Sequence, residues 1–445
     1  MRCGLPAGFW STPDSGQPSR LRHPAPPATE STCQHVFTTH PDLPYGDVTK
    51  HNSRNSHIRL SQHPERTDSV IEHQPAPDAI VVGGGIIGCT LAYELQKRKI
   101  NTLLLEHGKI GREASWATAG IMGPPSAAGL PLHRAALAEI SHKLFPALLE
   151  SVEEDGGVPS SYLPIGKVLI ARTEDEVELA QAQINWQINH GIDATWIEPD
   201  EVRQLEPMIP HDILGAFYSA DGGTLTGHRW TESVAAAFQA IGGQIRERCP
   251  AVSILTDGER VTGVDTPDGP ISTRTVVLSA GAWTRFLGPA IERSLPLIPF
   301  KGQMIGVLPE SAADRPRHVI GKITGGYLVP RIDGSVAVGA SLEDIGFDKR
   351  VTAFGLEYAM ELMQSLGPGL RNAEVVSTWA GLRPGTADDT PLMGPVPGYD
   401  GLWVSTGHHR TGIQLAPGSA VLVADAIATG KPDELLEHFS LERFS

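Results

Sequence analysis

The pattern that most restricts the fold of this chain is a glycine-rich turn between a short strand and a helix. The run AIVV at 79–82 is typical of a buried parallel strand. The turn GGGIIG follows at 83–88, and good helix formers continue from it to Lys99. A second apolar run over 102–105 then ends at Glu106. A strand, a glycine turn, a helix, a strand and an acid in this order predict the first βαβ unit of a dinucleotide-binding domain.

The three glycines of the GxGxxG pattern have separate mechanical tasks. Gly83 permits a tight turn, Gly85 lets the backbone approach a pyrophosphate, and Gly88 lets the helix pack closely on the strand. The helix N-terminus offers N–H groups to phosphates, and Glu106 offers acceptors for both ribose hydroxyls. The pattern alone does not separate NAD from FAD, and a purely structural βαβ turn remains the alternative.

Composition excludes several other classes of protein. The chain has 445 residues, of which 40% are hydrophobic and 20% charged, so most of it can bury a core. Its 36 Lys and Arg against 51 Asp and Glu give a net charge of −15, which disfavours nucleic acid or an anionic membrane as a partner. No uninterrupted apolar run of about 18 residues occurs, so no membrane span is predicted.

The four cysteines suggest neither cross-links nor a metal. Cys3, Cys33, Cys89 and Cys249 are widely separated and form no CxxC pair. This spacing predicts neither a disulfide framework nor a zinc site. We therefore expect a cytoplasmic protein without a bound metal.

The N-terminal part of the chain differs from the rest. Residues 1–75 contain ten of the 36 prolines and seven of the 17 histidines and show no apolar periodicity, so we expect 1–77 to be a disordered leader. The stretch 4–10 is too short and broken for a secretion signal. Irregular spacing of the histidines disfavours a metal-binding tract. Alternatively, translation starts at Val70 and the leader is a mis-assigned start, since the next methionine after Met1 lies beyond the glycine turn.

Three later segments point to a flat, electron-accepting ligand. Residues 111–122 and 275–283 are rich in small side chains, which let a backbone run close to a planar ring. Residues 402–414 predict a strand and a turn that lead into a helix reaching to about Thr429. The N–H groups at that helix N-terminus would face an electron-rich ring edge, as reduced flavin requires. These segments favour FAD over NAD.

Seven motifs in a fixed order resemble the glycine oxidases of thiamine biosynthesis, a family of FAD enzymes in the D-amino-acid oxidase superfamily. The resemblance covers about residues 78–430, and seven ordered motifs are far more specific than one glycine turn. The motifs are GGGIIG with Glu106, residues 114–122, KGQM at 301–304, YLVPR at 327–331, VGASLEDIGFDK at 338–349, WAGLRPGTADDTPLMG at 379–394 and GHHRTGIQLAP at 407–417.

The resemblance implies an α/β fold with two interleaved domains. A Rossmann-like FAD-binding domain would be built from 78–125, 223–295 and 378–445, and an α+β substrate domain with a large antiparallel sheet from 126–222 and 296–377. The residues agree independently. Hairpin signals occur at 326–339 and 251–266, and helical periods at 133–151, 174–189 and 351–366.

The resemblance also implies the cofactor contacts. FAD would be held without a covalent bond, because no Cys lies near Arg383 or Arg410. His408 and His409 would contribute backbone groups rather than act as an acid–base pair. The expected FAD-binding residues are Gly83, Gly85, Ile86, Ile87, Gly88, Glu106, His107, Ala114, Ser115, Ala119, Gly120, Ile121, Val252, Gly281, His408, His409, Arg410, Thr411, Gly412, Ile413 and Gln414.

For the substrate, the resemblance implies Arg383 as the group that grips a carboxylate, with Arg410 and Tyr327 beside it. A planar guanidinium fits a carboxylate bidentately. The alternatives are that Arg383 is a surface ion-pair partner, Arg410 a loop cation and Tyr327 a packing residue of the sheet. Asp388 and Asp389 predict a solvated turn whose side chains point apart, rather than paired catalytic carboxylates.

The implied reaction is oxidative deamination of glycine without a side-chain base. Hydride transfer to the flavin would leave an imino acid, which water converts to glyoxylate and ammonia, while O2 becomes hydrogen peroxide. The imine would feed the thiazole of thiamine, with a hand-off to thiazole synthase, and the enzyme would be a homo-oligomer, a tetramer by resemblance.

Substrate and electron acceptor stay open at this point. Trp116, Gly325 and Leu342 depart from the family pattern, so sarcosine, D-alanine or D-proline compete with glycine as substrate. Two other functions are a D-amino-acid dehydrogenase that reduces a quinone and a non-catalytic flavin-binding subunit. The presence of both Arg383 and Arg410 speaks against the second.

Overall fold

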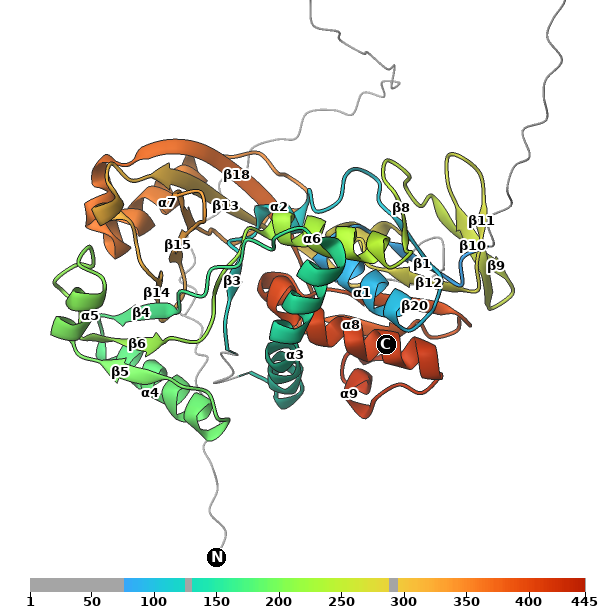
Figure 1. The fold of residues 1–445 in the computed structure, drawn as a ribbon, viewed down its shortest axis with the longest axis horizontal. Coiled ribbons are helices and arrows are strands. Elements are labelled where there is room, and N and C mark those ends of the chain that lie inside the picture. The colour runs from blue at the N-terminus through green and yellow to red at the C-terminus, as the bar shows by residue number, and fades with distance from the viewer. Residues whose placement is uncertain (1–75, 125–129, 288–294, 445) are drawn as a thin grey trace, which may run out of the picture. The chain divides into compact units, whose positions relative to one another are not determined.

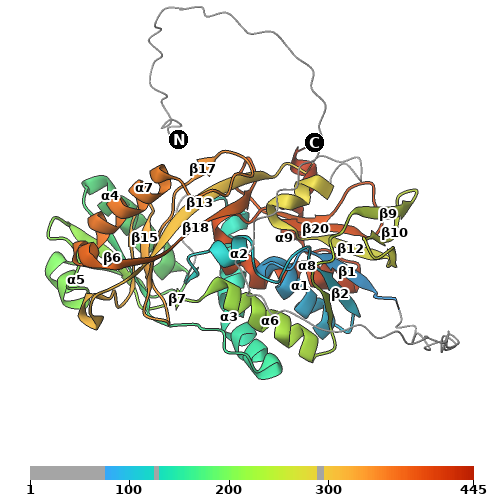
Figure 2. The same ribbon diagram turned by 90° about the horizontal axis from the view of Figure 1, so that it is seen from above.

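A computed structural model describes residues 76–124, 130–287 and 295–444. The chain divides into two units, Met1–Ile71 and Glu72–Ser445; the first lies outside the described residues, and the second is compact. The expectation of a disordered leader without a metal-binding histidine tract, and the alternative start at Val70, therefore fall outside the described residues, except for Ala76 and Pro77. Within the second unit, the two large sheets lie at opposite ends with the short helix α2 (Ala114–Ala117) between them (Figures 1 and 2).

The first sheet has six strands in the order β19-β20-β12-β1-β2-β8, and the predicted βαβ unit lies at its centre. β1 pairs in parallel with β2 and β12, and only the edge strand β19 runs antiparallel to its neighbour. The strands are β1 (Ala79–Val82), β2 (Thr102–Leu105), β8 (Gln244–Arg246), β12 (Thr275–Leu278), β19 (Leu392–Pro395) and β20 (Leu402–Thr406). β1 and β2 are buried along their whole length, which explains why their sequences are continuous apolar runs rather than alternating ones.

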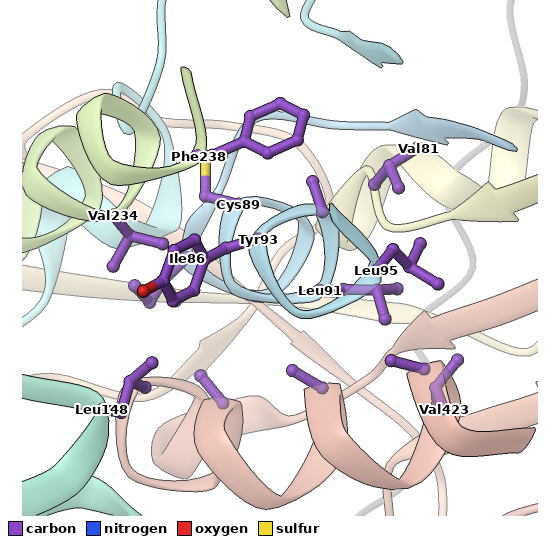
Figure 3. Packing of buried hydrophobic residues seen from close by; sticks show 14 of the residues in the cluster. Val81, Ile86, Cys89, Leu91, Tyr93, Leu95, Leu148, Val234, Phe238 and Val423 are labelled. Carbon is purple, nitrogen blue, oxygen red and sulfur yellow. The ribbon is translucent and has the colours of Figure 1, made fainter. Parts of the chain in front are cut away.

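Four helices form the core on one face of this sheet: α1 (Ile86–Lys97), α3 (Leu132–Gly156), α6 (Gly227–Ala240) and α8 (Gly412–Thr429). α1 lies among the other three. Figure 3 shows Leu91, Tyr93 and Leu95 of α1 with Val423 of α8 and Phe238 of α6. The opposite face is covered by a three-stranded sheet of β9 (Ser253–Asp257), β10 (Arg260–Asp265) and β11 (Ile271–Ser272).

The second sheet has nine strands and carries the helices α4, α5 and α7. Its order is β17-β13-β16-β15-β14-β4-β6-β5, with β18 paired to β13 as well. Its pairs are antiparallel except for β14 with β4, so the sheet is mixed. The elements are β4 (Lys167–Ala171), β5 (Thr195–Ile197), β6 (Gly215–Ser219), β13 (Ile298–Leu308), β14 (Val319–Lys322), β15 (Tyr327–Pro330), β16 (Val336–Gly339), β17 (Glu343–Asp344), β18 (Glu374–Gly385), α4 (Glu174–Asn189), α5 (Pro199–Leu205) and α7 (Ala353–Leu366).

Most predicted elements are present. The two hairpins are β15–β16 and β9–β10, the second with an irregular register between Val261 and Gly263. The helical periods correspond to α3, α4 and α7, although α3 continues to Gly156. β3 (Ile121–Met122) pairs with β7 (Gly223–Thr224) in a small separate sheet. The proposed assignment of chain segments to two domains stays a prediction.

The C-terminal helix passes a length and composition test for a membrane span, which the sequence interpretation did not anticipate. The segment His409–Thr429 has a mean hydropathy of 1.3, but 61% of its apolar window is buried inside the fold. α8 packs against α1 and α3, and its buried residues belong to the same core cluster. Contacts with other helices therefore account for its apolar composition.

Candidate active site

A cavity of about 400 Å³ opens where the carboxyl ends of β1, β2 and β12 meet the second sheet. In open parallel sheets, ligands bind at this edge of the strands. The glycine turn and Glu106 line one end of the cavity, and Tyr327 and Arg383 from the second sheet line the other. The two halves of the predicted site therefore share one cavity.

The structure confirms the packing tasks predicted for Gly83 and Gly88, whereas the pyrophosphate approach at Gly85 stays a prediction. Gly83 has a φ of +115°, and a Cβ on it would lie 2.5 Å from the Ser279 oxygen. A Cβ on Gly88 would lie 1.9 Å from the Gly83 oxygen, so α1 could not approach β1. At Gly85 the nearest atom to such a Cβ is Ser115 Oγ at 3.4 Å. Gly83 and Gly88 are thus required by packing, whereas Gly85 leaves the backbone open to the cavity.

Two side chains organise the nucleotide end of the cavity. The buried carboxylate of Glu106 accepts hydrogen bonds from Gly84 N–H and Gly108 N–H, each at 2.7 Å. Ser115 Oγ, from α2, accepts from Ile86 N–H at 2.9 Å, at the first residue of α1. The acid is therefore held rigidly at the end of β2, and the small-residue segment is tied to the helix N-terminus.

The residues present at this end fit FAD. An adenosine needs an acceptor for its ribose, which the fixed Glu106 supplies, and a pyrophosphate needs a helix N-terminus without an obstructing side chain, which Gly85 supplies. Cys89 and Cys249 are buried and line no part of the cavity. Among the described residues, no group of three or more His, Cys, Asp or Glu side chains is placed to hold a metal ion.

The small-residue segment is anchored to the second sheet. Trp379 Nε1 donates to the Ala117 oxygen at 3.1 Å, and Arg331 Nη2 donates to the Thr118 oxygen at 3.2 Å. Trp116, bulky for its position, packs edge-on against Trp379 with ring centroids 6.2 Å apart and is not part of the cavity lining. This departure from the family pattern therefore does not obstruct the cavity.

At the other end, Gly302 makes room for Arg383, and its paired glycine, Gly381, makes room for Ala117 of α2. Gly302 of β13 lies opposite Gly381 of β18, and Arg383 follows two residues later on the same face. A Cβ on Gly302 would lie 2.3 Å from the guanidinium nitrogens, so the guanidinium lies directly over this glycine. Arg383 Nη1 donates to the Ser341 oxygen at 3.0 Å and to the Lys301 oxygen at 3.3 Å.

Neither arginine of the predicted substrate site has an acidic partner within the described ranges. No ion pair among the described residues involves Arg383 or Arg410. Arg383 lines the cavity rather than the outer surface of the fold, which disfavours its interpretation as a surface ion-pair partner. Its guanidinium is fixed by backbone oxygens and is available to an anion in the cavity.

Tyr327 lines the cavity from β15, and a second tyrosine that the sequence did not single out lies near it. Burial raises the pKa of Tyr358 on α7, the Tyr327 hydroxyl adds to that shift, and Arg383 opposes it. Tyr358 therefore belongs to the surroundings of the substrate end. No local sequence signal marks it, because only the packing of α7 on the second sheet brings it there.

The two adjacent histidines have different hydrogen-bond partners. His408 Nε2 lies 3.0 Å from Ser419 Oγ in the core, and His409 Nδ1 is hydrogen-bonded to Asp389. His409 and Asp389 both have a left-handed backbone, with φ of +47° and +54°. Arg134 Nη1 lies 2.9 Å from Asp389 Oδ2, so α3 also contacts this turn.

The predicted solvated turn at Asp388 and Asp389 is present, with side chains 41% and 38% exposed, but the sequence did not predict their ion pairs. Their side chains do point apart, but Asp388 binds Arg443 at 2.8 Å while Asp389 binds His409 and Arg134. Burial opposes ionisation of Asp389, but the His409 hydrogen bond and the Arg134 charge outweigh it and lower its pKa to about 2. Both carboxylates are structural ion-pair partners.

The cavity contains most, but not all, of the residues expected there. The expected residues that line it are Gly83, Gly85, Ile86, Ile87, Glu106, His107, Ala114, Ser115, Ala119, Gly281, Tyr327, Arg383, His408, His409, Arg410, Gly412 and Ile413. The expected residues that do not line it are Gly88, Gly120, Ile121, Val252, Thr411 and Gln414. Lining residues that sequence reasoning missed include Lys109, Pro250, Ala251, Trp283, Phe286, Gly302 and Met304.

Packing explains several of the differences. Gly120 is required where its backbone approaches Leu225, because a Cβ there would lie 1.8 Å from the Leu225 oxygen. Val252 is 57% exposed, and its neighbours Pro250 and Ala251 line the cavity instead. Thr411 and Gln414 line a separate cavity of about 210 Å³ on the other side of α8. The roles assigned to these residues stay predictions.

A parallel sheet with a glycine turn, closed over by a second sheet that presents a free guanidinium, defines a dinucleotide-binding enzyme. Comparison with known proteins specifies it further. Residues 78–426 match the DAO family, described as FAD dependent oxidoreductase. The glycine oxidase of Pseudomonas putida is 37% identical over 355 residues, which are 79% of this chain and 95% of that protein.

Two further relatives agree. The crystal structure of glycine oxidase from Geobacillus kaustophilus superposes with a TM-score of 0.77 at 31% identity, covering 82% of this chain and 98% of that one. The bifunctional protein ThiO/ThiG of Trichormus variabilis is 32% identical over 82% of this chain and 55% of its own length. The chain therefore belongs to the DAO family of FAD-dependent oxidoreductases and, within it, to the glycine oxidases. Its cofactor is FAD, and the resemblance drawn from the seven motifs is confirmed.

The glycine turn predicts different effects for two similar substitutions. Gly88→Ala should destabilise the fold by about 1–3 kcal/mol and reduce the bound FAD, because the new methyl group collides with the Gly83 oxygen. Gly85→Ala should keep the thermal stability and weaken FAD binding, because its methyl group enters the cavity. Thermal unfolding and flavin absorbance measure the two effects. A Gly88→Ala protein as stable as the wild type would contradict the packing argument.

His408 predicts an acid-sensitive step in stability. Burial lowers its pKa from 6.5 to about 3, so the ring is neutral in the folded protein at pH 5 but protonated in the unfolded chain. The contribution of the neutral His408 ring to the free energy of unfolding is therefore present above pH 6.5 and is lost as the pH falls below 6.5. The loss is about 2 kcal/mol at pH 5. Urea unfolding at pH 7.5 and pH 5 should show this loss in the wild type and in the exposed control His211→Asn. This loss of stability between pH 7.5 and pH 5 should be absent from His408→Asn. If His408→Asn loses as much stability as the wild type, His408 is not the source of the loss.

Proposed function

We propose that this chain is an FAD-dependent oxidase of glycine, with Arg383 as the residue that binds the substrate carboxylate. The observation that carries the proposal is a guanidinium in the same cavity as the glycine turn, oriented by two backbone oxygens and without an acidic partner in the part of the chain that the structure describes. The similarity to glycine oxidases over four fifths of the chain supports the choice of substrate.

Arg383 would hold a small amino acid by its carboxylate. Its Nη1 is occupied by the Ser341 and Lys301 oxygens, which leaves the other nitrogens for the substrate. Each charge-assisted hydrogen bond to a carboxylate contributes roughly 1.5–3 kcal/mol. Tyr327 would add a hydroxyl donor, and Arg410 a second positive charge. The expected effect is a substrate held by one end with its α-carbon directed to the cofactor.

Bound FAD would supply the oxidising group, which accepts a hydride from the substrate α-carbon. The side chains nearest the turn at 408–409 are engaged elsewhere, since His408 contacts Ser419 and His409 binds Asp389. We therefore assign no side-chain base, and the substrate would react with a neutral amino group. The resulting imine would be hydrolysed by water to glyoxylate and ammonia.

The proposal includes finer points that depend on the same assignment. Oxygen would be the electron acceptor and hydrogen peroxide the product, with FAD held non-covalently. The enzyme would be a cytoplasmic homotetramer. Relatives named ThiO/ThiG join this type of sequence to a further segment of similar length, which supports a role in which the imine is passed to thiazole synthase.

Arg383→Ala should retain the yellow colour of bound FAD and lose kcat/KM for glycine by about 100-fold or more, because the carboxylate loses its charged partner. Stopped-flow reduction of the flavin by glycine measures the effect. The matched control is Arg371→Ala, which removes an exposed arginine outside the cavity and should leave kcat/KM within twofold. Unchanged kinetics in Arg383→Ala would place the substrate elsewhere.

Peroxide release distinguishes the oxidase from the alternatives. The purified protein should form hydrogen peroxide with glycine in air, and a panel with sarcosine, D-alanine and D-proline ranks the substrates. Turnover only with an added quinone would identify a dehydrogenase. If no amino acid reduces the flavin of the loaded protein, the remaining alternative is a non-catalytic flavin-binding subunit.

A further inference from the structure

A network of polar side chains lies behind the strand that faces the cavity. Along β13, Gly302 and Met304 line the cavity, so Lys301 and Gln303 point to the opposite face of the sheet. Lys301 is completely buried, and its Nζ lies 3.6 Å from Glu343 Oε2. Among the described residues, Lys301 Nζ has no hydrogen-bond partner.

Glu343 is the centre of this network. Its Oε1 accepts a hydrogen bond from Ser341 Oγ at 2.6 Å and another from Gln303 Nε2 at 2.8 Å. β17 and β13 are paired so that Glu343 lies opposite Lys301. Burial opposes ionisation of Glu343, but the two hydrogen bonds and the Lys301 charge outweigh it and lower its pKa. The Glu343 carboxylate thus contacts three side chains: it accepts hydrogen bonds from Ser341 and Gln303 and forms an ion pair with Lys301.

Ser341 connects this network to the substrate end of the cavity. Its backbone oxygen accepts from Arg383 Nη1 at 3.0 Å. Its N–H donates to the Gln303 oxygen at 3.3 Å, and its hydroxyl accepts from Gln303 N–H at 3.0 Å while donating to Glu343. Backbone and side chain of Ser341 are therefore both fixed, so the direction of its carbonyl is fixed as well.

Burying a lysine is a costly way to stabilise a sheet. Lys301 is fully buried, whereas the Glu343 side chain is 14% exposed. Taking a charge out of water often costs more than its attraction to a partner returns, and a well-packed apolar side chain is as stable. Glu343 is connected to the guanidinium proposed to bind substrate through two hydrogen bonds, one from the Ser341 hydroxyl to Glu343 and one from Arg383 to the Ser341 carbonyl. The value of the Lys301–Glu343 pair therefore lies in the orientation of the Ser341 and Lys301 carbonyls, both of which accept from Arg383.

We propose that Glu343 is a positioning residue for substrate binding, which holds Ser341 and through the Ser341 carbonyl orients the Arg383 guanidinium toward a carboxylate. The inference rests on the proposed role of Arg383 and adds a residue that contacts neither substrate nor cofactor. A misplacement of a binding group by about 1 Å can reduce a rate 100-fold, so loss of this support should be measurable.

The test compares two substitutions with a matched control. Ser341→Ala removes the hydroxyl that joins Glu343 to the Ser341 backbone, and Glu343→Gln removes the charge. Asp344→Asn makes the same acid-to-amide change at the exposed neighbouring position of β17. Acetate, a carboxylate that cannot be oxidised, serves as the probe, and its binding is followed by the change it causes in the absorbance of bound FAD.

We expect the Kd for acetate and the KM for glycine to rise by about tenfold in both Ser341→Ala and Glu343→Gln, with a smaller change in kcat. FAD content should stay at the wild-type level, and Asp344→Asn should remain within twofold in every measurement. If Glu343→Gln does not fold, Ser341→Ala tests the proposal alone, since it leaves the Lys301–Glu343 pair intact.

The inference is overturned if acetate binds the folded variants with wild-type affinity, even when their melting temperatures fall, because Glu343 would then only stabilise the sheet. Failure of the proposed function has a different signature. In that case the wild-type protein, loaded with FAD, would neither bind acetate nor oxidise glycine.

Discussion

The close approach of α1 to β1 is the constraint on which the rest of the site depends. It exists because Gly83 and Gly88 have no side chains. The Gly83 oxygen lies where a Cβ of residue 88 would be, and the Ser279 oxygen lies close to the place of a Cβ of residue 83. This contact aims the N-terminus of α1 into the cavity and places Glu106 at the end of the next strand. α1 then forms the centre of the core made with α3, α6 and α8. Fold stability and nucleotide recognition therefore share two glycines.

The second sheet uses glycine in a similar way. Gly302 and Gly381 lie opposite each other on the cavity face of two long strands, and the space left by their missing side chains is filled by the Arg383 guanidinium and by Ala117, respectively. The opposite face of β13 carries Lys301 and Gln303, whose partners hold the carbonyls that accept from Arg383. Because side chains alternate along a strand, the substrate face and the supporting face are separated by one backbone.

The sequence was sufficient for parts of the molecule whose signal is local. The βαβ unit, both hairpins and three helices follow from patterns within about 30 residues. Arg383 was identified only through the family resemblance, since nothing local distinguishes it from a surface arginine. The ion pair of Asp389 with Arg134 was missed because Arg134 comes from a helix 255 residues earlier. Glu343 and Tyr358 were missed for the same reason, because strand register and helix packing place them.

The charge distribution explains how an acidic protein can bind a carboxylate. The net charge of −15 repels anions at long range, but salt screens that field over about 8 Å. An amino acid is a zwitterion, so the long-range field acts on it weakly, and recognition depends on local groups. Arg383 supplies a positive charge that no described acid neutralises, whereas Lys301, on the other face, is neutralised by Glu343. The positive charge available to the substrate carboxylate is therefore that of Arg383, whose guanidinium is oriented by the Ser341 and Lys301 carbonyls.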